Sequence, residues 1–169
     1  MRHVTLASDD LAICYWQNLV VVVWTGNTLP HHVADIRFAV ERARKASDGP
    51  VCLLQLVIPE AAIPDSGART ALSNMLRSFE GTVSHSAVVH FGSGFRACVV
   101  RSVVTAISAL RRQGFPHQVF GSIQDSITWL VSNVKALQPS PTYRMAQQFY
   151  DEAVAGGSRA ERLPQTRAV

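Results

Sequence analysis

The most distinctive pattern in the chain is a run of eight residues, Val51 to Ile58, that is almost entirely apolar and rich in β-branched side chains. Turn-forming residues flank it, with Asp48-Gly49-Pro50 before it and Pro59 after it. A half-exposed strand would alternate polar and apolar side chains, and this run does not. It therefore predicts a strand buried on both faces, which is typical of a parallel sheet covered by helices.

Two further strands are predicted before this run, at Leu11 to Trp16 and Leu19 to Thr25. Only Gln17-Asn18 separates them, and a two-residue connection indicates an antiparallel hairpin. The segment from His31 to Ser47 then shows apolar residues at helical spacing, with charged residues on its other side.

After the long apolar run, the pattern alternates between helices and strands. Asp65-Ser66-Gly67 offers N-cap chemistry, and we expect Ser66 to cap a helix that ends near Gly81. Strands are predicted at Val83 to Phe91 and Gln118 to Gly121. Between them, Gly92-Ser93-Gly94 should form a turn that leads into a long apolar helix running to Arg112. Ser122 with Asp125 three residues later is a capping-box pattern for the next helix.

This order predicts an α/β fold with a five-stranded mixed sheet, formed by an N-terminal β-hairpin and then parallel βα units. About four helices should pack on it, and a C-terminal tail helix should follow. We expect residues 1–138 to form a single domain. Residues 139–169, where the composition changes, should be an extension with one amphipathic helix and a disordered end.

The composition argues against two classes of function, nucleic-acid binding and membrane insertion. The chain has 169 residues, 47% of them hydrophobic and 17% charged, with a formal net charge of +4. The basic residues are scattered, whereas nucleic-acid binding needs a dense basic stripe. The apolar run from Leu19 to Trp24 is too short to span a membrane. We therefore expect a cytoplasmic protein with no nucleic-acid partner and no membrane insertion.

Neither the cysteines nor the histidines form a catalytic or metal-binding pattern. Cys14, Cys52 and Cys98 are widely spaced, which indicates small core residues, and no metal or other cofactor is expected. His85 and His90 should point to opposite faces of one strand, and His117 should lie in a turn. The histidines are expected to face solvent or to be hydrogen-bonded. We therefore do not expect an enzyme.

The element order, together with Val119-Phe120-Gly121-Ser122 followed by Trp129-Leu130, resembles STAS/SEC14-like domains over roughly residues 11–135. The resemblance implies a non-enzymatic regulatory or scaffolding module that binds another protein or, in some branches, a small or lipidic ligand. In the anti-sigma-factor antagonists, a partner kinase phosphorylates a serine that follows an aspartate at the start of a helix. The matching candidate phosphoacceptor here is Ser66, after Asp65.

A ligand-binding corner is also predicted from the sequence. Ligands of open parallel sheets bind beyond the carboxyl ends of the strands. The turn Gly92, Ser93 and Gly94 should lie there, and its free backbone N–H groups with Arg96 suit an anion or polar headgroup. The alternative is an ordinary tight turn.

Phe38 lies between Arg42 and Lys45 on the charged side of its predicted helix, where a solvated residue would be expected. An aromatic side chain among basic residues is typical of the centre of an interface. Three contacts are open: a protein partner of unknown identity, a second copy in a homodimer, or the tail helix through Tyr143, Phe149 or Tyr150.

Two functions are the leading candidates, and an enzyme with an unrecognised site is the third. One is a STAS-like module that acts through protein–protein contacts. The other is a binding protein for a small anionic or lipidic ligand at the carboxyl edge of the sheet. A deep apolar pocket at that edge would favour ligand binding, and a flat edge with exposed aromatic residues would favour protein contacts.

Overall fold

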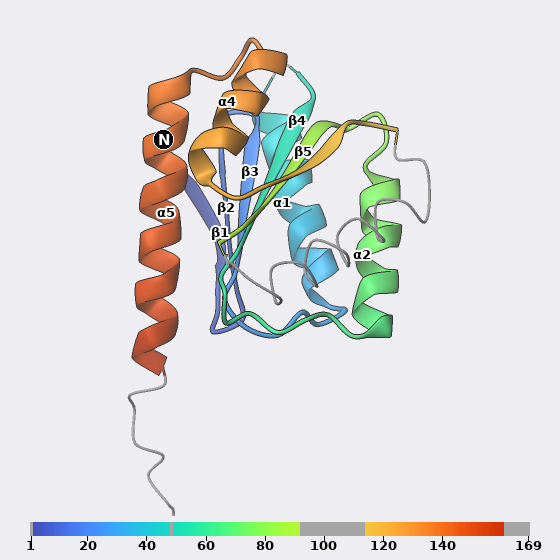
Figure 1. Cartoon of the computed structure of the whole chain (residues 1–169). Coiled ribbons are helices and arrows are strands. Elements are labelled where there is room, and N and C mark those ends of the chain that lie inside the picture. The colour runs from blue at the N-terminus through green and yellow to red at the C-terminus, as the bar shows by residue number, and fades with distance from the viewer. Residues whose placement is uncertain (1, 48, 92–113, 161–169) are drawn as a thin grey trace, which may run out of the picture.

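The computed structural model describes residues 2–47, 49–91 and 114–160. These residues form an α/β fold with a mixed six-stranded sheet whose strands lie side by side in chain order (Figure 1). The strands are β1 (His3–Ala7), β2 (Leu11–Trp16), β3 (Leu19–Trp24), β4 (Val51–Val57), β5 (Val83–His90) and β6 (His117–Phe120).

Helices cover both faces of the sheet. They are α1 (His32–Ala46), α2 (Ser66–Ser78), α4 (Ile123–Asn133) and α5 (Pro139–Ala160). In Figure 1, α1 and α2 lie on one face, and α4 and α5 lie on the other. This arrangement is the three-layer one that strands without polar alternation require.

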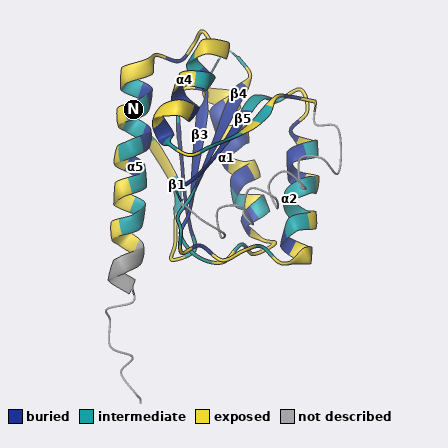
Figure 2. Ribbon diagram, in the orientation of Figure 1, coloured by how far each residue is buried: buried dark blue, intermediate teal, exposed yellow. Residues whose placement is uncertain are grey.

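The central strands confirm the prediction of burial on both faces. β2 and β3 form the predicted antiparallel hairpin, with Gln17 in the left-handed region at φ 53°. β3 then pairs parallel with β4, with Val21 opposite Leu54. All six residues of β3 are buried, and Figure 2 shows these strands almost uniformly dark blue.

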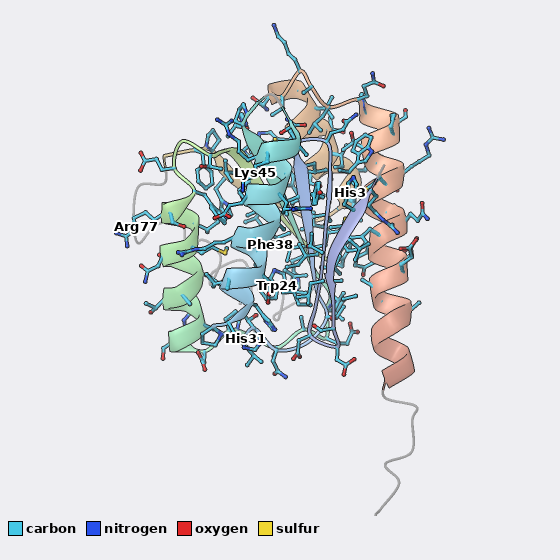
Figure 3. All side chains as sticks on the ribbon, turned by 180° about the vertical axis from the view of Figure 1, so that it is seen from behind. His3, Trp24, His31, Phe38, Lys45 and Arg77 are labelled. Atoms are coloured by element: carbon cyan, nitrogen blue, oxygen red, sulfur yellow. The ribbon has the colours of Figure 1, made fainter. Side chains whose placement is uncertain are left out.

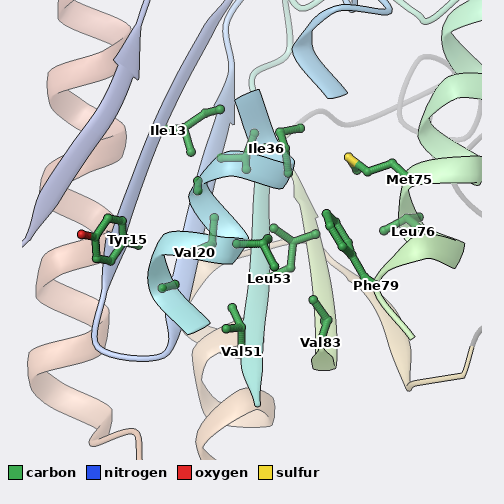
Figure 4. Packing of buried hydrophobic residues seen from close by; sticks show 14 of the residues in the cluster. Ile13, Tyr15, Val20, Ile36, Val51, Leu53, Met75, Leu76, Phe79 and Val83 are labelled. Atoms are coloured by element: carbon green, nitrogen blue, oxygen red, sulfur yellow. The ribbon is translucent and has the colours of Figure 1, made fainter. Parts of the chain in front are cut away.

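The two faces of the sheet carry separate hydrophobic cores. Under α1 and α2, side chains such as Val20, Leu53 and Ile36 pack together (Figure 4). Under α4 and α5, Val21 and Leu54 pack against helix residues such as Leu130. Successive residues of each strand thus contribute to opposite cores, as the pleat of a strand requires.

The prediction of five strands was wrong, because β1 adds a sixth at the edge of the sheet. It pairs antiparallel with β2, and the register shifts between Val4 and Leu6. Three of its five residues are exposed, so it lacks the apolar signal that marked the other strands. Its pairing with β2 makes it a strand.

α5 is integrated into the hydrophobic core. Ala146 and Phe149 on this helix are buried against the sheet, in the same cluster as β2 and β3. Arg2 also reaches α5: its guanidinium forms an ion pair with Glu152 at 2.6 Å and lies 5.3 Å from the centre of the Phe149 ring. The predicted boundary at residue 138 falls in the connection between α4 and α5. Residues 161–169, predicted to be disordered, lie outside the described residues.

One predicted helix cap is confirmed and one is wrong. Ser122 caps α4, and its hydroxyl accepts a hydrogen bond from the backbone N–H of Asp125 at 3.1 Å. For α2, however, the N-cap is Asp65, whose carboxylate accepts from the N–H of Ala68 at 2.7 Å. Ser66 is the first helical residue, and its side chain is exposed.

These caps predict different costs for two neighbouring substitutions. Asp65→Ala should lower the free energy of unfolding by about 0.5–2 kcal/mol, because it leaves an N–H at the start of α2 without its partner. The matched control Ser66→Ala should change it by less than about 0.5 kcal/mol. Urea denaturation of both variants tests this, and a larger loss in Ser66→Ala would contradict the assigned cap.

Candidate functional site

A mainly apolar cavity of about 70 Å³ lies between the sheet and α2. It is close to the carboxyl edge of the sheet, since Trp24 and Val57 in its wall are the last residues of β3 and β4. The lining residues are Trp24, Thr28, Gln55, Val57, Ala61, Ala62, Ile63, Pro64, Leu72, Met75, Leu76, Val88 and His117. Gln55 and His117 stand out because they bring amide and imidazole groups to a described lining whose other polar side-chain groups are the Thr28 hydroxyl and the Trp24 indole N–H.

Gln55 is the one amide side chain in β4, and it is only 7% exposed. The indole N–H of Trp24 donates a hydrogen bond to its Oε1 at 3.3 Å. This bond uses the carbonyl end of the amide. Its Nε2 has no hydrogen-bond partner among the described residues, although an amide nitrogen carries two donors.

His117 brings a second polar group to the cavity from the first position of β6. It pairs with Ser86 of β5, which sets it on the same face of the sheet as Val88. Both of its ring nitrogens are buried and have no hydrogen-bond partner. Desolvation lowers the pKa of His117 to about 4, so the ring is neutral near pH 7 and offers one donor and one acceptor.

Hydrogen bonds connect two loops beside the cavity. The Asp10 carboxylate accepts from the N–H of Asn27 at 2.6 Å and holds the turn after β3. Gly26 fits this turn because a Cβ there would lie 2.2 Å from Asp10 Oδ1. The N–H of Ala62 donates to the carbonyl of Gly26 at 3.1 Å and joins the β4–α2 loop to the same turn. Next to Ala62, Ile63 is both part of the lining and 42% exposed, which places it at the mouth.

The predicted anion corner lies outside the described residues. Gly92, Ser93, Gly94 and Arg96 all fall within the segment 92–113, so the structure describes nothing at these positions. The candidate phosphoacceptor Ser66 is described. It is exposed at the N-terminus of α2 and takes no part in the cavity lining.

The predicted interface residues share the solvent-facing side of α1. Phe38 is 54% exposed, and the Arg42 guanidinium lies 5.8 Å from the centre of its ring, a cation–π geometry. Lys45 is exposed one turn later. Figure 3 shows Phe38 and Lys45 on α1, with the sheet between this helix and α5.

This arrangement excludes the tail helix as the partner of Phe38. α5 packs on the opposite face of the sheet, where Phe149 is 3% exposed and Tyr143 and Tyr150 join the second core. The contact between Phe38 and the tail, one of the three options from the sequence, is therefore wrong for the described part of the helix. The two intermolecular options remain.

The other candidate chemical groups are separated in the structure. His85 contacts Trp129 of α4 at 5.4 Å between ring centres, whereas His90 pairs with Val57 and faces the α1–α2 side, which confirms their opposite placement. The described residues hold no group of three potential metal ligands. Burial raises the pKa of the Cys14 thiol to about 12 and that of Cys52 to about 11, so neither forms a reactive thiolate at neutral pH.

Sequence patterns missed the two polar residues of the cavity. His117 was expected in a turn, facing solvent or hydrogen-bonded, and the structure contradicts this: it begins β6 and its ring nitrogens are buried without partners. A signal for Gln55 was present, because an amide in the middle of an otherwise apolar strand needs a polar partner or a function.

Comparisons with known proteins identify no relative. No family model matches the chain, and searches of curated proteins and of solved structures found no match. Within the described residues, no helix has the length and apolar character needed to cross a membrane.

The buried neutral His117 predicts a pH-dependent stability. Its folded-state pKa is about 4 against 6.5 for an ordinary histidine, so the unfolded chain binds a proton first as the pH falls. The free energy of unfolding should therefore decrease between pH 6.5 and 4, by up to about 1.4 kcal/mol per pH unit from this group. Urea denaturation across this range should show a shallower decrease in His117→Gln.

The control is His3→Gln, which replaces an exposed histidine. It should retain the pH dependence of the wild-type protein. Identical pH profiles for the wild-type protein and His117→Gln would contradict the burial of the His117 ring.

Proposed function

We propose that the protein binds a small, largely apolar ligand in the cavity between the sheet and α2. The observation that carries the proposal is the unused hydrogen-bonding capacity of Gln55 and His117 in this cavity. Buried polar groups in folded proteins are nearly always hydrogen-bonded, and exceptions call for an explanation. An apolar cavity with a few polar groups is also the usual form of a small-molecule site.

The position of the cavity supports the same function. Open sheets with parallel strands bind their ligands beyond the carboxyl ends of the strands, and Trp24 and Val57 end their strands at the cavity. Its described lining contains no carboxylate, lysine or arginine. An apolar ligand therefore fits this lining better than an anionic one.

The cavity volume limits the part of the ligand that enters. An engineered cavity of about 150 Å³ in another protein holds one benzene molecule. By proportion, the 70 Å³ here accommodates about three non-hydrogen atoms. A larger ligand, such as the five-carbon ring of cyclopentane, would enter in part and extend past Ile63 to solvent.

A cavity-filling substitution tests the proposal. Ala61 lines the cavity and is 4% exposed, so Ala61→Leu should place its added carbons in the empty volume. We expect cyclopentane to raise the melting temperature of the wild-type protein, because a ligand that binds only the folded state stabilises it. Ala61→Leu should reduce this shift by more than half.

Two further variants make the cavity-filling test decisive. Leu72→Phe fills the cavity from α2 and replaces Ala61→Leu if that variant fails to fold. Ala46→Leu, at an exposed position of α1, is the matched control and should keep the wild-type shift. Equal responses to cyclopentane in the filled and control variants would contradict binding in the cavity.

A second candidate function is a STAS-like regulatory or scaffolding module that acts through protein contacts. The exposure of Phe38, with Arg42 over its ring, favours it, because aromatic and arginine side chains are enriched in interfaces. A second copy of the chain is the version of this contact that purified protein can test. Most soluble oligomers are symmetric homo-oligomers, and α1 could then pack on its copy across a two-fold axis.

Phe38→Asp tests this second candidate. If α1 forms the contact between copies, the wild-type protein should show a concentration-dependent rise in mass by analytical ultracentrifugation. Phe38→Asp should stay monomeric with an unchanged melting temperature, because the side chain it replaces is outside the core. Arg37→Asp, also exposed on α1, controls for the added charge. A wild-type protein that is monomeric at all concentrations would rule out the homodimer.

A further inference from the structure

We infer that the cavity selects uncharged ligands that carry a hydroxyl or primary amide group beside a short apolar body. This inference rests on the proposed function and specifies its ligand class. It follows from the hydrogen-bonding groups that Gln55 and His117 leave unused, and from the absence of charge in the described lining.

Gln55 requires a hydrogen-bond acceptor on the ligand. The indole N–H of Trp24 occupies Gln55 Oε1, and this bond orients the amide so that Nε2 is the end left for a ligand. An amide nitrogen only donates. A hydrocarbon would offer no acceptor to this donor, which disfavours it.

His117 requires a ligand group that can both donate and accept. Its neutral ring has one N–H donor and one bare nitrogen, and neither has a partner in the structure. A hydroxyl or a carboxamide can pair with whichever ring nitrogen faces the ligand, because it can accept from the N–H or donate to the bare nitrogen. An ether or a ketone accepts only, so it would leave the bare ring nitrogen unpaired.

The placement of the two side chains sets where the apolar body lies. Gln55 is on β4 and His117 is on β6, with Val88 of β5 in the wall between them. Met75 and Leu76 of α2 close the opposite side. A ligand that reaches either polar group therefore lies over Val88, with its carbon atoms between the sheet and α2.

Charged ligands are disfavoured by the same lining. Moving an ion from water into an apolar cavity is costly unless a countercharge meets it. The described wall offers no acidic or basic side chain, and His117 is neutral near pH 7. An ammonium or carboxylate of the same size should therefore bind far more weakly than the alcohol.

Three probes that share a five-carbon ring and differ in polarity test the ligand class. They are cyclopentanol, cyclopentane and cyclopentylammonium, titrated into the full chain and followed by NMR chemical-shift changes. In the wild-type protein, cyclopentanol should bind about five- to tenfold more tightly than cyclopentane, because the hydrocarbon leaves buried polar groups unpaired. Cyclopentylammonium should show no saturable binding.

Substitutions then show which residues produce the preference for cyclopentanol over cyclopentane. His117→Leu and Gln55→Met should each reduce the preference for cyclopentanol to about twofold or less. His117→Gln retains a donor and an acceptor, so it should keep most of the preference. Ser86→Ala is the matched control: it removes a buried hydroxyl on the neighbouring strand that is not part of the lining, and it should retain the full preference.

The outcomes separate this inference from the proposed function. If cyclopentane and cyclopentanol bind equally well, and Ala61→Leu weakens both, the cavity is a ligand site and the inferred selectivity is wrong. If no probe binds, or Ala61→Leu leaves all binding unchanged, the proposed function fails as well. A loss of preference in Ser86→Ala equal to that in His117→Leu would overturn the assignment of His117 as the ligand contact.

Discussion

The parallel pairing of β3 and β4 is the constraint on which the rest of the structure depends. Both strands are apolar at nearly every position, so each needs cover on both faces. α1 and α2 cover one face, and α4 and α5 cover the other (Figure 1). The β2–β3 hairpin, near the start of the chain, therefore depends on α5, near its end. α5 buries the outer part of the second face against β2 and β3.

The cavity follows from an interruption of this apolar pairing. Gln55 is a polar residue in β4, and Trp24 at the end of β3 meets its carbonyl oxygen but not its amide nitrogen. His117 adds a second incompletely bonded group from β6. In a packed core, such groups are normally paired or replaced by apolar residues. Their occurrence together in the wall of one cavity is the basis for assigning it a binding role.

Local patterns in the sequence predicted the central elements well. The two-residue connection at Gln17 predicted the β2–β3 hairpin, the unbroken apolar run predicted β4, and Ser122 with Asp125 predicted the start of α4. Each of these signals is contained within a few neighbouring residues. The exposed position of Phe38 also followed from the helical periodicity of α1 alone.

Features that depend on distant residues were not predictable in this way. β1 has little apolar signal of its own and is a strand because β2 pairs with it. The N-cap is Asp65 and not Ser66 because α2 begins at Ser66, one residue earlier than a Ser66 cap would require. His117 is buried because β6 pairs with β5 in a register that brings it beside Ser86, and no local pattern encodes that register.

The central claim is that a small neutral molecule enters the cavity between the sheet and α2. Nuclear Overhauser effects between bound cyclopentanol and the methyl groups of the protein locate the probe most directly. We predict contacts from the ring protons to Met75 and Val88, which line the cavity from opposite sides. Contacts only to exposed residues such as Val4, with none to Met75 or Val88, would contradict the account.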